Sequence, residues 1–513
     1  MEWLPMPPAE GRGALSRTGR TLIIAFLSVV GLAVRLDRIF DPPLDFHPTR
    51  QYRSAILARG CYYSSAPSIP EWKREIAGLN QSSEGLLEPP VMEQFACLAY
   101  RLSGSEHLWV PRAFSSILWV AGGILLYRCA RRIASAGAAL CSIGYYLFLP
   151  FGIAASRSFQ PDPLMVVLIV GSLLTLLRYD EKRSVSRLAT TALVAAGAVF
   201  VKPVSLFAIL GAFLALRIRE RGLRKATVDP HLWIFVGASL LPAAAYAFYE
   251  MLLVKGALRD QAFGSFRPEL LLRCAYYGGW LRQIRRSVGV ASVGAAVLGL
   301  LTVGKGRRQA LLLGLCSGYL CFALAFTYHI HTHNYYQLQL IPIVALCLAP
   351  AFDAIVHRLD QPRRRGYLRV CLVVIALGTI AYPIYAHRRS RAGGERTVAT
   401  AQEVGDIVEH SRRIIFLAPD YGMPLKYHGE VAGWIWWDSR ELRLRAEQRG
   451  GPVPSVEDRF VQIQKESSPE YFVVTDLKEF EAQPDLERFL RKRFPVKESE
   501  RYRIFDLRTA LMP

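Results

Sequence analysis

The sequence lacks the two glycine-rich patterns, the P-loop and GxGxxG, with which many proteins cradle the phosphates of nucleotides. That absence argues against an ATP-driven pump. No internal repeat and no low-complexity tract stands out, and no two of the nine cysteines have the spacing of a metal site. Only 20% of the residues are charged, and the 42 acidic residues are outnumbered by 63 basic ones. No cofactor is predicted.

Long apolar blocks are what the sequence has in abundance. Hydrophobic residues make up 52% of the 513 residues, and blocks of fifteen to twenty of them carry almost no charge. About 20 residues of helix cross the hydrocarbon core of a bilayer, so these blocks predict membrane-spanning helices. The first of these blocks, residues 21–40, lacks a small-residue cleavage site, so it is interpreted as a membrane helix and not as a removed signal peptide. The predicted spans are 21–40, 109–127, 136–154, 163–178, 232–253, 287–303, 310–329, 338–356 and 368–386.

The net charge of +21 is not the mark of a nucleic-acid-binding protein here. Basic clusters occur in every second loop between the apolar blocks, which is the positive-inside pattern of cytoplasmic loops. A nucleic-acid groove would instead gather its charge on one face, with aromatic platforms. No nucleic-acid partner is therefore predicted.

The basic loops also define the topology. The loops at 178–187 and 217–228 are both basic, so residues 188–216 must leave the cytoplasm and return as two short arms that meet at Lys202 and Pro203. About eleven helices result, with residues 1–20 in the cytoplasm, a membrane domain over 21–386 and the carboxyl terminus outside. The predicted outer segments are 41–108, 155–162, the Lys202 tip, 254–286 and 330–337. The predicted location is the bacterial cytoplasmic (inner) membrane.

Residues 387–513 differ in character from the membrane domain. RRIIFLAPD and EYFVVTD are runs typical of buried strands, LERFLRKRF is amphipathic at helical spacing, and YRIFDLR alternates like a strand. We predict a small extracytoplasmic α/β domain. The run GWIWWD, residues 433–438, is interpreted as core packing or an interfacial belt, with a sugar-stacking wall as the alternative.

The longest outer loop contains Cys61 and Cys97. These two cysteines either pair in an oxidising compartment or remain two ordinary buried thiols. The only histidine cluster is HIHTHN, residues 329–334. Three imidazoles close together can bind zinc, but neighbouring histidines in a short loop more often serve as hydrogen-bonding groups, so no metal is predicted.

Polar side chains gather in the predicted outer segments, at the ends of apolar helices. Charge near a bilayer is costly unless it faces a wet cavity or a partner, so such clusters are candidates for function. Solvation and snorkelling explain any one of them alone. The candidates are Asp41, Asp45, His47, Arg50, Arg53, Glu88, Arg157, Asp162, Lys202, His331, His333, Tyr335 and Tyr336.

Five motifs occur in a recognisable order along the chain. D-x-H-P-T-R-Q follows the first helix, E-P-P precedes the second, W-x-P-R begins it, Q-P-D precedes the fourth, and H-N-Y-Y-Q-L-x-L-I-P leads into the tenth. From about residue 20 to residue 386 the chain resembles the GT-C glycosyltransferases of the dolichyl-phosphate-mannose protein mannosyltransferase type, which include the bacterial aminoarabinose transferases. The resemblance implies a GT-C-like fold and two amphipathic helices along the membrane surface within 41–108.

The resemblance also implies a polyprenyl-phosphate-linked sugar donor and transfer to an acceptor outside the cytoplasm, which is a lipid, a glycan or a protein. Many members have Asp-Glu in the first loop, whereas Phe46 follows Asp45 here. Asp45 and Asp41 therefore both remain candidates for the base, with Asp162 as a third catalytic candidate.

The residue types suit that chemistry independently. A carboxylate can activate the acceptor hydroxyl, and arginine and lysine can meet the charge of the departing phosphate. Displacement by one activated acceptor would invert the anomeric carbon. Two alternatives remain open at this stage, a polymerase or ligase that uses the same lipid carriers and a secondary transporter, although transporter acids usually lie at mid-bilayer rather than at outer helix ends.

Overall fold

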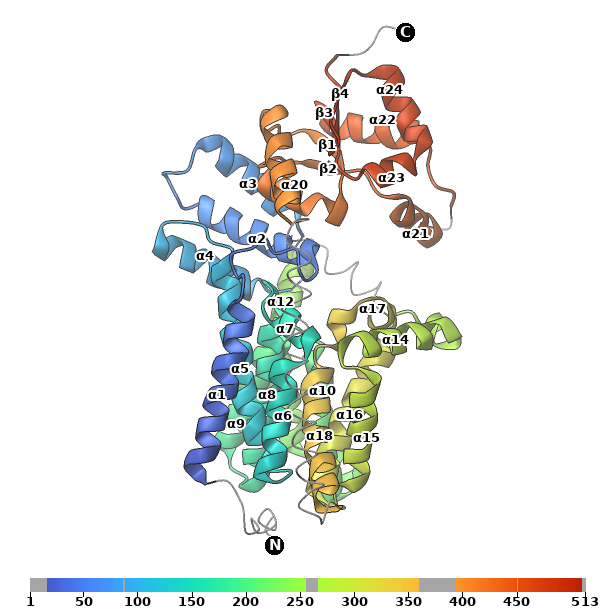
Figure 1. The fold of residues 1–513 in the computed structure, drawn as a ribbon. Coiled ribbons are helices and arrows are strands. Elements are labelled where there is room, and N and C mark those ends of the chain that lie inside the picture. The colour runs from blue at the N-terminus through green and yellow to red at the C-terminus, as the bar shows by residue number, and fades with distance from the viewer. Residues whose placement is uncertain (1–15, 86–87, 255–265, 359–393, 450, 510–513) are drawn as a thin grey trace. The chain divides into compact units, whose positions relative to one another are not determined.

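The computed structural model of the protein describes residues 16–85, 88–254, 266–358, 394–449 and 451–509. These residues divide into two compact units (Figure 1). Unit 1 contains residues up to 39, 86–91 and 109–386, and unit 2 contains 40–85, 92–108 and 387–513. Each unit is described by itself.

Unit 1 is a bundle of helices in which α1, α5, α8 and their neighbours run side by side (Figure 1). Its longer helices are α1 (Arg17–Leu36), α5 (Trp109–Ala130), α6 (Ala136–Phe148), α8 (Asp162–Glu181), α9 (Val185–Val201), α10 (Ser205–Arg221), α12 (Pro230–Tyr249), α14 (Cys274–Ser287), α15 (Val290–Thr302), α16 (Arg307–Ala325) and α18 (Leu340–Arg358). Its shorter ones are α7 (Pro150–Ser156), α11 (Leu223–Thr227), η1 (Glu250–Val254), η2 (Pro268–Leu272), α17 (Thr327–Thr332) and η3 (Asn334–Gln337).

Six helices among the described residues are long and apolar enough to cross a membrane, or up to eight if each of two bent pairs forms one span. The chain is thus an integral membrane protein. The count of about eleven remains a prediction, because α9 and α10 have only 17 residues each and the predicted span 368–386 lies outside the described residues.

A buried arginine and a close approach of two helices contribute to the packing of the bundle. The buried Arg35 of α1 donates to the Ser156 hydroxyl and to the backbone carbonyls of Gly31 and Leu147, so its polar atoms are satisfied among apolar helices. Helices α10 and α16 approach backbone to backbone, because Gly211 faces the small-residue pair Gly314 and Gly318. Such small residues let membrane helices pack closely.

Unit 2 contains a five-stranded sheet in the order β2-β1-β3-β5-β4. Pairs β1–β2 and β1–β3 are parallel, and pairs β3–β5 and β4–β5 are antiparallel. The runs predicted as buried strands form β1 and β3, in which every residue is buried. The strands are β1 (Ile414–Leu417), β2 (Gly433–Ile435), β3 (Tyr471–Val474), β4 (Val496–Glu498) and β5 (Arg503–Asp506).

Helices cover both faces of this sheet (Figure 1). Successive strand residues point to opposite faces, so Ile415 and Leu417 join one hydrophobic core while Ile414 and Phe416 join the other. The first core includes residues of α22 and α24, and the second includes residues of α20 and of the helix over 394–407. The helices are α20 (Met423–His428), α21 (Ser439–Arg449), α22 (Val456–Ser467), α23 (Leu477–Glu481) and α24 (Pro484–Arg493), with the 3-10 turn η4 (Pro419–Gly422).

The helices of the first long loop belong to the same unit as the sheet. They are α2 (Pro48–Tyr63), α3 (Glu71–Ser83) and α4 (Val91–Ser103), and a disulfide between Cys61 and Cys97 joins α2 to α4. Polar contacts tie them to the segment around α20. The Tyr52 hydroxyl lies 2.8 Å from His428 Nε2, and Asn80 donates to the carbonyl of Val431 at 2.9 Å. Burial lowers the pKa of His428 to about 3, so its imidazole is neutral at pH 7 within this contact.

The indole of Trp436 lies in the core next to α22 and α24. It is 2% exposed, makes an edge contact with Phe472 and donates to Gln483 Oε1 at 3.0 Å. The sequence pattern of GWIWWD predicts one strand with Trp434 and Trp436 on the same face. Strand β2 ends at Ile435, so this prediction is wrong, because only Trp434 lies in the strand. The burial of Trp436 agrees with the core-packing interpretation of GWIWWD.

Trp436→Ala is expected to lower the free energy of unfolding of unit 2 by about 3–5 kcal/mol, because it leaves a cavity and an unpaired Gln483. Thermal unfolding of the purified variant measures this loss. Trp434→Ala is the matched control and should cost clearly less, since Trp434 is only half-buried. A Trp436→Ala protein of unchanged stability would remove Trp436 from the core.

Candidate functional site

Asp162 and Lys202 form a buried ion pair in unit 1. Lys202 Nζ lies 2.9 Å from Asp162 Oδ1, and the two residues are 4% and 1% exposed. Asp162 begins α8 and Lys202 caps the end of α9, two helices that pack against each other. Pro203 favours an extended backbone at the residue before it, which is what Lys202 adopts (φ −158°, ψ 110°). The chain therefore leaves α9 at the level of the Asp162 carboxylate.

Glu88 and two tyrosines complete this cluster, which we call the Lys202 cluster: Glu88, Asp162, Lys202, Tyr335 and Tyr336. Glu88 Oε1 is 3.2 Å from Lys202 Nζ. The ring centroids of Tyr335 and Tyr336 lie 5.3 and 5.2 Å from the same nitrogen, within the range of cation–π attraction. One ammonium thus faces two carboxylates and two aromatic rings at the ends of apolar helices.

The histidines of HIHTHN lie beside these tyrosines. The rings of His329 and Tyr336 stack with centroids 5.0 Å apart, and His333 contacts Tyr335 edge-on at 5.4 Å. His331 Nδ1 lies 2.7 Å from the carbonyl of Thr327, one turn back in α17. Among the described residues no group of three histidine, cysteine, aspartate or glutamate side chains could hold a metal ion.

Arg157 is also in unit 1 and is 1% exposed. Its Nη2 donates to the carbonyl of Arg38 at 3.0 Å, and its own carbonyl accepts from Arg112 at 3.3 Å. These bonds connect the segment before α8 to the end of α1 and the start of α5. Arg157 therefore connects three segments of unit 1, and its role toward a phosphate stays a prediction.

The first-loop candidates Asp41, Asp45, His47, Arg50 and Arg53 lie in unit 2. Gln51 is fully buried and donates to the carbonyls of Pro43 and Phe46, with Asp45 Oδ1 at a longer 3.4 Å. His47 precedes α2 with a positive φ of 46°, an uncommon backbone conformation for a residue other than glycine. The hydrogen bonds of Gln51 and the turn at His47 therefore fix the backbone on both sides of Asp45.

Arg53 is engaged within unit 2. Its Nη2 donates to the carbonyl of Gly85, and its Nε lies 3.9 Å from Glu84 Oε2. Glu84 also binds Lys426 at 3.1 Å, so Arg53 joins a network between the first loop and α20. These contacts give Arg53 a structural partner, and its predicted role in binding phosphate remains untested.

Tyr246 was not among the predicted residues. Its hydroxyl, on α12, donates to the carbonyl of Glu88 at 3.3 Å, and its ring contacts Phe200 edge-on near the end of α9. The position of Tyr246 near the outer end of the predicted span 232–253 was its only signal. It holds Glu88 beside Lys202.

Comparison with known proteins places this arrangement in context. Residues 87–248 match the family model described as dolichyl-phosphate-mannose-protein mannosyltransferase. No curated protein matches the sequence. The chain is similar to the crystal structure of ArnT from Cupriavidus metallidurans bound to undecaprenyl phosphate, with a TM-score of 0.57 and 15% identity over 96% of this chain and 98% of that chain.

Two further solved structures are similar. The archaeal oligosaccharyltransferase AglB from Archaeoglobus fulgidus, in complex with an inhibitory peptide and a dolichol-phosphate, matches with a TM-score of 0.56 and 12% identity over 93% of this chain and 72% of that chain. The arabinofuranosyltransferase AftD from Mycobacteria matches with a TM-score of 0.52 and 15% identity over 96% of this chain and 42% of that chain. At such identities these likenesses show a shared fold. Together with the family match, they confirm the resemblance to GT-C glycosyltransferases predicted from the sequence.

Proposed function

We propose that this protein is a membrane glycosyltransferase that moves a sugar from a polyprenyl-phosphate-linked donor to an acceptor hydroxyl on the extracytoplasmic side. The observation that carries the proposal is the Lys202 cluster, in which a buried ammonium faces two carboxylates at the ends of apolar helices. A lipid phosphate needs a cation at the edge of an apolar region, and its sugar needs carboxylates within reach.

Lys202 would meet the phosphate charge as it develops on the leaving group. An ammonium is a point charge that can be shared between a carboxylate and a phosphate, and the Tyr335 and Tyr336 rings add attraction from a second side. His331, His333, Arg50 and Arg157 are the further cations or hydrogen-bond donors assigned to this role by the proposal. The relatives bound to undecaprenyl phosphate and dolichol-phosphate support this choice of donor.

A carboxylate would take the proton of the acceptor hydroxyl while the oxygen attacks the anomeric carbon and the bond to the lipid phosphate breaks. Asp45, Asp162 and Asp41 are the candidates. Attack from the face opposite the phosphate would invert the anomeric configuration. The sugar keeps its atoms, the lipid phosphate leaves with the bonding electron pair, and the proton leaves on the base.

The disulfide between Cys61 and Cys97 supports the proposed orientation. Disulfides persist in oxidising compartments and are rare in the cytosol. The first loop, which carries the disulfide and Asp45, is therefore proposed to face outward from a bacterial inner membrane, as the loop charges also predict.

A direct assay tests the proposal. The detergent-purified protein is given undecaprenyl phosphates that carry radiolabelled glucose, mannose or arabinose, with membranes from a deletion strain as the acceptor source. Label from one of these donors is expected to leave the lipid and appear in an acceptor product. If the protein in proteoliposomes instead moves the intact labelled lipid across the membrane without cleaving it, the proposed function would be that of a transporter and not of a transferase.

A further inference from the structure

Unit 2 has a crevice at the carboxyl ends of β1 and β3. The chain passes from β1 to β2 on one side through α20, and then returns to β3 on the other side through α21 and α22. Residues of α20 and α22 belong to the cores on opposite faces of the sheet. In open α/β sheets, ligands bind outside the carboxyl ends of the strands at the point where the strand order reverses.

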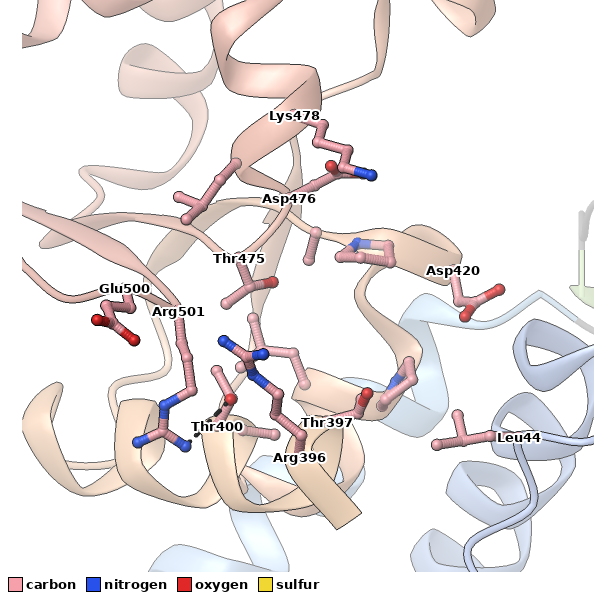
Figure 2. A pocket seen from close by; sticks show the side chains of 16 residues that line it. Leu44, Arg396, Thr397, Thr400, Asp420, Thr475, Asp476, Lys478, Glu500 and Arg501 are labelled. Atoms are coloured by element: carbon pink, nitrogen blue, oxygen red, sulfur yellow. Dashed lines mark hydrogen bonds between the residues drawn. The ribbon is translucent and has the colours of Figure 1, made fainter. Parts of the chain in front are cut away.

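A cavity of about 370 Å³ lies at this point (Figure 2). Asp420 comes from the segment after β1, and Thr475 and Asp476 come directly after β3. The helix over 394–407 supplies Arg396, whose side chain extends toward the loop that carries Thr475 (Figure 2). Pockets of a few hundred Å³ hold small ligands, and this one has the size for a monosaccharide unit.

Several polar groups of this cavity are not used by the rest of the protein. Within the described ranges, the side chains of Arg396, Lys478 and Thr475 make no hydrogen bond or ion pair. Arg501 differs, because it binds Glu403 and donates to the Thr400 hydroxyl at 3.4 Å. Two cations and one hydroxyl are thus available to a molecule in the cavity.

The turn that carries Asp420 is strained. Asp420 and Tyr421 have φ values of +52° and +57°, a left-handed conformation that is costly for residues other than glycine. Such strain persists where the surrounding structure fixes it, often at ligand sites. Burial raises the pKa of Asp420, and among the described residues the only hydrogen bond to its side chain comes from the Thr49 hydroxyl at a long 3.4 Å.

The wall of the cavity is continuous with the segment that carries a predicted base. Leu44 lines the cavity and is followed by Asp45, while Thr49, in the first turn of α2, contacts Asp420. These residues all belong to unit 2. A molecule in the cavity would lie against this part of the first loop.

We propose that this cavity is a recognition site for a sugar unit that carries a phosphate or carboxylate group. The carboxylates of Asp420 and Asp476 accept hydrogen bonds from sugar hydroxyls, Thr475 adds a hydroxyl, and Arg396 and Lys478 meet the anionic group. Its use as the acceptor subsite, beside Asp45, rests on the proposed glycosyl transfer, whereas the binding itself does not.

Calorimetric titration of the full-length protein in detergent with glucose 6-phosphate, glucuronate and glucose tests the site. At least one of the two anionic sugars is expected to bind at least about tenfold more tightly than glucose, and the stronger one tells whether the site prefers phosphate or carboxylate. Arg396→Gln is expected to remove that advantage, while Asp420→Asn weakens the binding of the anionic sugar that the protein prefers. Arg488→Gln is the matched control, because Arg488 is an exposed arginine on α24 outside the cavity.

Three results would overturn the assignment. The affinities for all three sugars could be equal, none of the sugars could bind saturably, or Arg396→Gln and Arg488→Gln could change the affinity equally. Binding of undecaprenyl phosphate, measured on the same preparations, separates this proposal from the transferase proposal. If the protein binds the sugar but not the lipid, the sugar site in the cavity stands and the proposed lipid donor is wrong. If it binds the lipid but not the sugar, the proposed donor stands and the sugar site is wrong.

Discussion

Lys202→Met is expected to weaken the binding of undecaprenyl phosphate on the order of 100-fold or more. Removing one partner of a buried, hydrogen-bonded charge pair between two binding partners costs about 2–5 kcal/mol of binding free energy. The proposed pair is the one between the lipid phosphate and the Lys202 ammonium, which has little access to water. Scintillation binding of radiolabelled undecaprenyl phosphate to the detergent-purified variant measures the loss.

The methionine variant leaves two carboxylates near one another without their cation, which also endangers folding. Lys202→Arg keeps the charge and is expected to retain part of the binding, because a point contact depends less on the guanidinium fork. Lys202→Met combined with Asp162→Asn removes the pair together and serves as the folding control, checked by size-exclusion chromatography. A folded methionine variant with unchanged lipid affinity would take Lys202 out of the site and shift the expectation to Arg50.

Asp45→Asn is expected to lower turnover by about 10²–10⁴-fold while donor binding stays nearly unchanged, because the amide keeps the shape of the side chain but cannot accept a proton. Asp162→Asn is expected to lower turnover and also to weaken donor binding, since Asp162 is the carboxylate held 2.9 Å from Lys202. The different effects on kcat and on donor affinity distinguish a base from a residue that positions the cation. Single-turnover transfer from a labelled donor provides both quantities.

Glu93→Gln is the matched control for these two variants, because Glu93 is a buried carboxylate of unit 2 that accepts from the Ser54 hydroxyl at 2.6 Å and was not predicted to act in catalysis. Near-normal turnover in both aspartate variants would make the catalytic assignment wrong. Asp41→Asn would then be the remaining test of the first loop.

The sequence predicted those features that depend on local periodicity. The two arms that meet at Lys202 appear as α9 and α10, and the buried runs appear as β1 and β3. Each of these follows from a pattern within one short window of residues. The resemblance to GT-C proteins likewise depended on short motifs in a fixed order.

The sequence did not predict which of the candidate side chains bind one another. Asp162 and Lys202 were expected as a catalytic carboxylate and a phosphate ligand in separate loops, and only the packing of α8 against α9 makes them an ion pair. Arg53 looked as available as Arg50, yet it contacts Glu84 and Gly85. The crevice at β1 and β3 also had no signal, because Arg396, Asp420 and Thr475 are far apart along the chain.

The composition of unit 2 has a consequence for how the protein is made. Its first-loop helices leave the ribosome before residues 109–386, and its sheet leaves the ribosome after them. At about 5–20 residues per second, tens of seconds pass before Val431 and His428 exist to receive Asn80 and Tyr52. During that interval the nascent loop is restrained by contacts among its own residues, such as the disulfide between Cys61 and Cys97 and the hydrogen bond from Ser54 to Glu93. Chains that terminate early therefore expose an unfinished docking surface to chaperones and proteases.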